Sequence, residues 1–348
     1  MINGGSCNLA SINLSKLAVN PFTDKAYVDF DKLKYLTDLG IKYLDEVVDD
    51  NIKNQPLEVQ KQMAEKYRNC GLGFLGLSDL LIKMGYEYGK EESINLVDKI
   101  GRTMIEQALL TSTQLAEEKG AFPGCNVDAI LQAPFVQENA TEEILERIQN
   151  YGLRNSSLLS IAPTGSISIL CSASSGGIEP LFQISYNRTT KSLHGEDRVY
   201  KVYADVVAEL MEAQGIESEE ELPDYVVTSS DIDYRDRIKM QSTVQKYIDT
   251  AISSTINLPE ETTVETIADI YYESWKANLK GVTVWRTNCE RAGILTLDTP
   301  NEKKIHEVKE DTVVKLDNSC PKCGSPLEHV NGCKQCSNAD CHYGACDI

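Results

Sequence analysis

The sequence contains little positive charge and no long apolar run. Its 348 residues include 34 Lys and Arg against 53 Asp and Glu, which gives a net charge of −19. A protein that coats nucleic acid needs a basic face to neutralise phosphates, so we expect no direct nucleic-acid binding. No segment approaches the roughly 18 apolar residues of a membrane span, and residues 1–6 lack the basic and apolar regions of a signal peptide. We therefore expect a cytoplasmic protein with no membrane partner.

Apolar residues are sufficient for a folded core, because they make up 41% of the chain. Their helical spacing predicts helices over 30–50, 91–118, 201–215 and 239–256. The β-branched segment 281–286 predicts a strand. Helices and short apolar strands alternate along the chain, which indicates an α/β fold.

The composition changes near Asp298 and divides the chain. Residues 298–318 are charged and contain few large apolar side chains, which is typical of a linker. We therefore expect a compact unit over 1–297, a charged linker over 298–318 and a separate cysteine-rich end.

Cysteine is concentrated at that end, where six of the 11 cysteines fall within the last 29 residues. An odd total and tight clustering argue against a secreted disulfide scaffold and favour metal or redox chemistry in a reducing compartment. Segment 319–338 contains two Cys-x-x-Cys pairs, and four thiolates form the ligand set of a structural zinc ion. The segment is too short to fold on a hydrophobic core, so we predict a zinc ribbon that the metal stabilises. The predicted ligands are Cys320, Cys323, Cys333 and Cys336, with His329 and His342 as alternatives.

The last two cysteines, Cys341 and Cys346, lie five positions apart. They exceed the four thiolates that zinc needs, so segment 339–348 is predicted to be a redox-active tail. Such a tail can reduce a buried disulfide by thiol–disulfide exchange. The alternative is that the two cysteines extend the metal site.

Two glycine-containing segments are candidates for nucleotide binding, and the first is the stronger candidate. In 155–170, a short buried strand, a Pro-Thr-Gly turn and a second element are predicted. The turn would expose backbone N–H groups and hydroxyls that suit a phosphate, although an ordinary Ser-capped turn is the alternative. The string Gly71-Leu-Gly-Phe-Leu-Gly76 matches a dinucleotide fingerprint, but no buried strand precedes it. We interpret these glycines as close packing at the start of a helix over 77–82.

Six segments occur in one order along the chain. They are CNLASINL (7–14), GLGFLGLSDL (71–80), RNSSLLSIAPTGSIS (154–168), SGGIEP (175–180), TINLP (255–259) and the cysteine-rich end. Together they resemble the C-terminal half of the catalytic chain of adenosylcobalamin-dependent (class II) ribonucleotide reductases. The resemblance implies the C-terminal part of a ten-stranded α/β barrel, followed by a small zinc-ribbon tail. It also implies that ribonucleoside di- or triphosphates are reduced to deoxyribonucleotides by thiyl-radical chemistry, with adenosylcobalamin as the cofactor.

The resemblance assigns roles to individual residues. Cys7, by default a buried structural cysteine, falls on the barrel cysteine that becomes half of the substrate-oxidised disulfide. Cys341 and Cys346 fall on the tail pair that reduces this disulfide again, and a thioredoxin- or glutaredoxin-like protein supplies the electrons. The two Cys-x-x-Cys pairs fall on the zinc ligands. The loop that holds the substrate phosphates falls on Thr164, Gly165, Ser166, Ile167 and Ser168.

The chain departs from the family in three places. The Asn-Pro-Cys-Gly-Glu loop with the thiyl cysteine should lie just before Cys7, and residues 1–6 do not contain it. We therefore expect the chain to need an N-terminal reductase half as a separate partner chain, or to be a fragment. Segment 283–286 lacks the tyrosine pair of class I chains, which favours the cobalamin class. Arg237 stands where the resemblance predicts a histidine. The alternative function is a non-catalytic zinc-ribbon adaptor on a decayed barrel.

Overall fold

The computed structural model describes residues 4–190, 198–288, 320, 323, 325–330, 333–338, 341 and 344–346. The chain divides into two units, Met1–Leu297 and Asp298–Ile348. The linker predicted over 298–318 lies outside the described residues. In the described part of the chain, no helix combines the length and apolarity that crossing a membrane requires.

The first unit contains eleven α-helices and eight strands among its described residues. The helices are α1 (Phe30–Asn54), α2 (Glu58–Tyr67), α3 (Leu77–Met84), α4 (Glu91–Lys119), α5 (Val127–Gln132), α6 (Pro134–Asn139), α7 (Glu142–Tyr151), α8 (Gly165–Leu170), α9 (Asp205–Gln214), α10 (Tyr234–Gln245) and α11 (Val264–Lys276). The strands are β1 (Asn8–Asn13), β2 (Ala18–Val19), β3 (Tyr27–Val28), β4 (Cys70–Leu75), β5 (Ser185–Thr190), β6 (Arg198–Tyr203), β7 (Thr255–Leu258) and β8 (Thr283–Arg286). Short 3-10 helices cover Leu14–Leu17 and Glu219–Glu221.

Five parallel extended segments form the centre of this unit. β1 pairs with β4, β4 is bridged to residues 157–161, and these are bridged to Ile252. The chain continues from Ile252 into β7, which pairs with β8. Within the described residues, β1 and β8 are the two ends of this arc and the barrel is not closed. The predicted α/β class is confirmed, and the assignment of this unit to the C-terminal part of a ten-stranded barrel stays a prediction.

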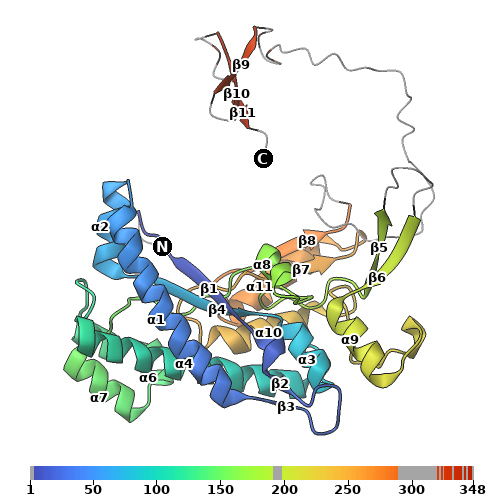
Figure 1. Cartoon of the computed structure of the whole chain (residues 1–348), viewed down its shortest axis with the longest axis horizontal. Coiled ribbons are helices and arrows are strands. Elements are labelled where there is room, and N and C mark those ends of the chain that lie inside the picture. The colour runs from blue at the N-terminus through green and yellow to red at the C-terminus, as the bar shows by residue number, and fades with distance from the viewer. Residues whose placement is uncertain are drawn as a thin grey trace. The chain divides into compact units, whose positions relative to one another are not determined.

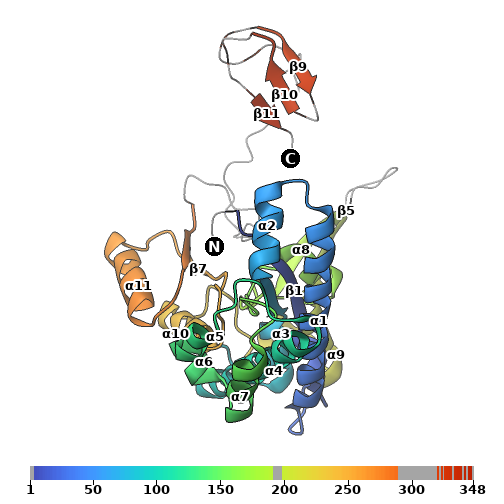
Figure 2. The same ribbon diagram turned by 90° about the vertical axis from the view of Figure 1, so that its left-hand side faces the viewer.

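Helices cover the arc because the connections between parallel strands must cross over. α1 and α4 pack against each other, and Leu33, Ile41 and Leu44 of α1 are buried. Figure 1 shows α1 and α4 side by side next to β1 and β4, and Figure 2 shows α11 and α1 at opposite sides of the unit.

Three sequence-based predictions of elements were wrong in part. The helix predicted over 239–256 ends at Gln245, because the chain then enters the arc as β7. The helix predicted over 201–215 begins at Asp205, since residues 198–203 form β6. The glycines at 71 and 73 lie in a fully buried strand, β4, rather than at the start of a helix. A Cβ at Gly73 would collide with the Ser160 carbonyl, so the neighbouring segment can approach only a glycine.

The second unit contains a small antiparallel sheet. Its strands are β9 (Leu327–Val330), β10 (Cys333–Cys336) and β11 (Gly344–Cys346), in the order β11-β10-β9. Residues 344–346, predicted to belong to a separate tail, therefore pair with a strand of the ribbon.

Candidate active site and metal centre

The turn after residues 157–161 carries the residues predicted to hold phosphate. Thr164 precedes α8 and has a left-handed backbone, with φ of 53° and ψ of 20°. This conformation is strained for a β-branched residue, and such strain gathers at functional sites. A Cβ at Gly165 would meet no atom within 4 Å. The start of α8 is therefore open.

The hydroxyl groups of this turn have different environments. Thr164 and Ser168 are buried: Ser168 Oγ donates to the Thr164 carbonyl, and Thr164 Oγ1 accepts a hydrogen bond from the Gly177 amide at 2.8 Å. Residues 165–167 are exposed. Amides in the first turn of a helix have no intrahelical partner. The donors that can meet an anion are therefore the amides of 165–167 and the Ser166 hydroxyl.

A second loop, residues 174–179, lies against this turn. Asp79 in α3 accepts hydrogen bonds from the first two amides of the loop, at 2.7 and 2.9 Å. A Cβ on Gly176 or Gly177 would collide with the backbone of residues 162–163. The two loops are therefore in direct backbone contact, and only glycine permits this approach.

Cys7 is half-buried just before β1. Its Sγ and the Ser160 Cβ lie 2.8 and 3.1 Å from the point that a Cβ on Gly71 would occupy. Ser160 precedes Thr164 by four residues, and four residues span at most about 14 Å. The arc therefore brings Cys7 and the Thr164 turn into one region of the unit.

Burial, and then the charge of Asp249, raise the pKa of Cys7 to about 11. The Cys7 side chain is therefore a protonated thiol at neutral pH. The Asp249 carboxylate accepts hydrogen bonds from the amides of Leu158 at 2.6 Å and Leu159 at 2.9 Å. Desolvation raises the pKa of Asp249 to about 6 despite these two bonds. Proximity of a carboxylate thus makes the Cys7 thiol a weaker acid.

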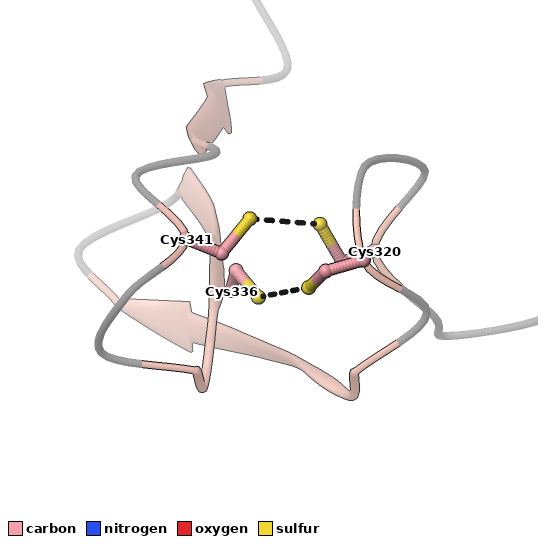
Figure 3. Close-up of side chains that lie close together, drawn as sticks. Cys320, Cys336 and Cys341 are labelled. Carbon is pink, nitrogen blue, oxygen red and sulfur yellow. Dashed lines mark hydrogen bonds between the residues drawn. The ribbon is translucent and has the colours of Figure 1, made fainter.

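Four cysteines of the second unit form a cluster in which all sulfur atoms lie within 4.8 Å of one another. The sulfurs of Cys320 and Cys341 are 3.8 Å apart, and those of Cys323 and Cys336 are 3.4 Å apart. Figure 3 shows Cys341 turned toward Cys320, with Cys336 below them. Sulfurs about 2.3 Å from a tetrahedral zinc ion are roughly 3.8 Å apart. The four-cysteine cluster therefore fits zinc in its donor type and its spacing.

Three of the predicted ligands, Cys320, Cys323 and Cys336, lie in this cluster together with Cys341, and the predicted ligand Cys333 stays a prediction. The side chains of Cys333 and Cys346 lie outside the described residues. Their backbones are Cα partners in β10 and β11. Cα partners of antiparallel strands are about 4.5–5.5 Å apart, and disulfides span a similar distance.

Sequence reasoning assigned no role to Arg237 or Asp249. The signal for Arg237 was its departure from the histidine that the resemblance predicts. Glu179, which pairs with Arg237, lies inside the recognised 175–180 segment. No local pattern marks Asp249, since only the fold brings it to residues 158 and 159.

Comparison with known proteins gives one family. Residues 3–285 match the model of the ribonucleotide reductase barrel domain. A vitamin B12-dependent ribonucleoside-diphosphate reductase of Mycobacterium tuberculosis is 31% identical over 311 residues, covering 85% of this chain and 40% of the relative. The enzyme of the same description from Thermoplasma acidophilum is 32% identical over 348 residues, covering 91% of this chain and 42% of the relative.

A similar solved structure is the class Id ribonucleotide reductase alpha subunit of Actinobacillus ureae, with a TM-score of 0.61 and 21% identity. The match covers 81% of this chain and 50% of that subunit. At this identity the likeness concerns the fold. The chain thus spans about two fifths of the length of the curated relatives it matches.

Proposed function

This chain belongs to the ribonucleotide reductase barrel-domain family, and we propose that it is the C-terminal part of a reductase that converts ribonucleotides to deoxyribonucleotides. The observation that carries the proposal is the convergence of Cys7 and the Thr164 turn on residues 157–161. This convergence supports the proposal, because a protonated thiol lies beside the segment that leads into the turn with the exposed amides of residues 165–167.

The proposed reaction replaces the ribose 2′-hydroxyl by hydrogen. The hydroxyl leaves as water, and two thiols become a disulfide, which supplies two electrons and two protons. Cys7 is one of these thiols, and the raised pKa keeps its proton in place for transfer. The second thiol and the thiyl cysteine belong to the part of the reductase that this chain does not contain. The substrate is a ribonucleoside di- or triphosphate, whose phosphates meet the amides of residues 165–167.

Adenosylcobalamin, which the sequence resemblance implies, would supply the radical, and the names of the relatives describe vitamin B12-dependent enzymes. We assign no described side chains to a corrin, and no step above runs through that cofactor.

The second unit is proposed to return electrons to the barrel disulfide. The four-cysteine cluster would hold a structural zinc ion through Cys320, Cys323, Cys336 and Cys341. Cys333 and Cys346, as Cα partners, would then be the shuttle dithiol. One thiolate attacks the Cys7 disulfide, the other resolves the mixed disulfide, and a thioredoxin- or glutaredoxin-like protein reduces the pair again. The other arrangement gives zinc to Cys333 and the shuttle to Cys341 with Cys346.

The rest of the reductase is proposed to complete the arc at both ends. The helices nearest these ends carry apolar side chains that nothing described covers. On α1, beside β1, these are Tyr35, Leu39 and Tyr43, and on α11, beside β8, they are Val264, Tyr271 and Trp275. Exposed apolar stripes at helical spacing mark packing surfaces. This favours a complementary half that buries both helices.

The decisive experiment mixes the purified chain with a complementary reductase half, adenosylcobalamin, ribonucleotide and a thioredoxin system. We expect deoxyribonucleotide only from the mixture. Cys7→Ser should abolish turnover, while Cys171→Ser, an exposed cysteine of the same unit, should leave it intact. Reduction by this chain without the other half would contradict the assignment of the missing cysteines.

Zinc content separates the two arrangements of the tail. We expect Cys341→Ser to lose zinc and Cys333→Ser to keep it. Cys333→Ser and Cys346→Ser should stop turnover with thioredoxin, and a small-molecule dithiol should restore part of it. Full turnover by both variants with thioredoxin would contradict the shuttle role of Cys333 and Cys346.

A further inference from the structure

Arg237 is a buried cation near the start of α10. Its side chain is 3% exposed and lies over the ring of Tyr88, 5.5 Å from the centroid. Nη2 donates to the Glu179 carboxylate, to Ser254 Oγ at 3.2 Å and to the Thr255 carbonyl at 2.8 Å. Glu179 Oε1 accepts a hydrogen bond from the Thr255 amide at 2.7 Å. The ion pair therefore fixes both backbone polar groups of the first residue of β7.

Stability alone explains this ion pair poorly. Arg237 Nη1 is buried and has no hydrogen-bond partner among the described residues. Desolvating a charge is costly, and an unsatisfied donor adds to the cost. Buried ion pairs can often be replaced by apolar residues without loss of stability. A buried arginine with an unused donor therefore calls for another explanation.

The ion pair holds the end of loop 174–179, which packs against the proposed phosphate site. The Tyr88 hydroxyl donates to the Ile178 carbonyl at 2.6 Å, and the next residue is Glu179. The preceding residue, Gly177, donates its amide to Thr164 Oγ1. Three consecutive loop residues are thus held by Tyr88, by Arg237 and by the turn itself.

We propose that Arg237 and Glu179 form a positioning clamp for the Thr164 turn. They hold the end of loop 174–179 so that its glycines contact the backbone of residues 162–163. This contact fixes the positions of the amides of residues 165–167. The inference rests on the proposed function for what those amides bind. Arginine suits the clamp because its planar guanidinium lies over the Tyr88 ring while Nη2 contacts the Glu179 carboxylate, and a lysine ammonium has no planar group to stack there.

The test uses the full chain and inorganic pyrophosphate as the probe. Pyrophosphate affinity is measured by calorimetry, and backbone hydrogen exchange is followed by mass spectrometry. Arg237→Lys keeps the charge and Glu179→Gln keeps the shape. We expect each to weaken pyrophosphate binding about tenfold and to speed exchange in residues 162–179 by tenfold or more. A binding group displaced by about 1 Å can lose this much.

Asp45→Asn is the matched control, because Asp45 forms another buried ion pair, with Arg68, and touches neither loop. It should lower the stability of the unit without changing pyrophosphate affinity or exchange in 162–179. The proposed clamp would be contradicted if Arg237→Lys and Asp45→Asn changed the rate of hydrogen exchange in residues 162–179 by the same amount. If the wild-type chain binds no pyrophosphate while the exchange difference persists, the phosphate role of the turn fails and the clamp stands.

Discussion

The two units of this chain are stabilised by different interactions. In Met1–Leu297, a continuous core of aliphatic and aromatic side chains lies between the parallel strands and their helices. In the described part of Asp298–Ile348, Cys320 is the one buried apolar side chain. The first unit therefore depends on many contacts of similar size, whereas the second depends on a single centre of four thiols.

The largest effect is expected from disrupting the four-cysteine cluster. Metal binding contributes about 10–16 kcal/mol to small zinc domains, so Cys320→Ser or a chelator should abolish the proposed zinc binding and unfold the second unit. The thermal transition of the first unit should not move. Metal analysis and circular dichroism check this, with Cys171→Ser as the control. A Cys320→Ser chain that keeps one zinc ion per molecule would contradict the prediction.

A core cavity is expected to have the next largest effect, and in the first unit alone. Phe74 is fully buried in β4, and Phe→Ala changes in cores cost about 3–5 kcal/mol. Phe74→Ala should lower the free energy of unfolding of the first unit by this amount and leave the zinc content unchanged. Denaturant titration measures it. Tyr43→Ala, at an exposed aromatic, should change it by less than about 0.5 kcal/mol.

Asp249 gives the first unit a pH dependence of its own. Its folded pKa of about 6 lies above its usual 3.8, so the folded state binds this proton more tightly than the unfolded state. The stabilisation is complete below pH 4 and is lost as the pH rises through 6. The stability advantage of wild type over Asp249→Asn should therefore shrink by about 2–3 kcal/mol between pH 4 and pH 7. An advantage that stays constant or grows would contradict this.

Cys7 should differ from an ordinary thiol in its reactivity. Because its pKa is raised to about 11 from 9.0, its thiolate fraction at pH 8 is about a hundredfold lower, and iodoacetamide should alkylate it about a hundredfold more slowly. Mass spectrometry of the labelled peptides follows the rate. Asp249→Asn removes the nearby charge and should speed the reaction, while an unchanged rate would show that burial alone sets the pKa.

The smallest effect separates the two kinds of hydroxyl in the turn. Ser166→Ala removes an exposed donor and should weaken pyrophosphate binding a few-fold without a change in stability. Ser168→Ala removes the bond to the Thr164 carbonyl and should lower stability by about 1 kcal/mol. Calorimetry and denaturant titration distinguish them, and equal effects of the two variants on stability would contradict the assignment.

Much of the fold was predictable where a pattern is local. The helices at 30–50 and 91–118 correspond to α1 and α4, and the strand at 281–286 to β8, because each has a long or strongly patterned apolar run. The strand β4 was missed, since glycines at 71 and 73 carry no propensity for strands. They are required only because residues 157–161 pack against them.

The sequence by itself determined the family, the position of the Pro-Thr-Gly turn and the abundance of thiols at the C-terminal end, because these depend on residue type and order. Tertiary structure alone decided which sulfurs meet, so that Cys341 joins Cys320, Cys323 and Cys336. It also decided that Asp249 acts on Cys7 and that Arg237 pairs with Glu179. The physical reason is that charge effects, metal ligation and backbone contact depend on separation in space, which residues distant in sequence acquire only when the chain folds.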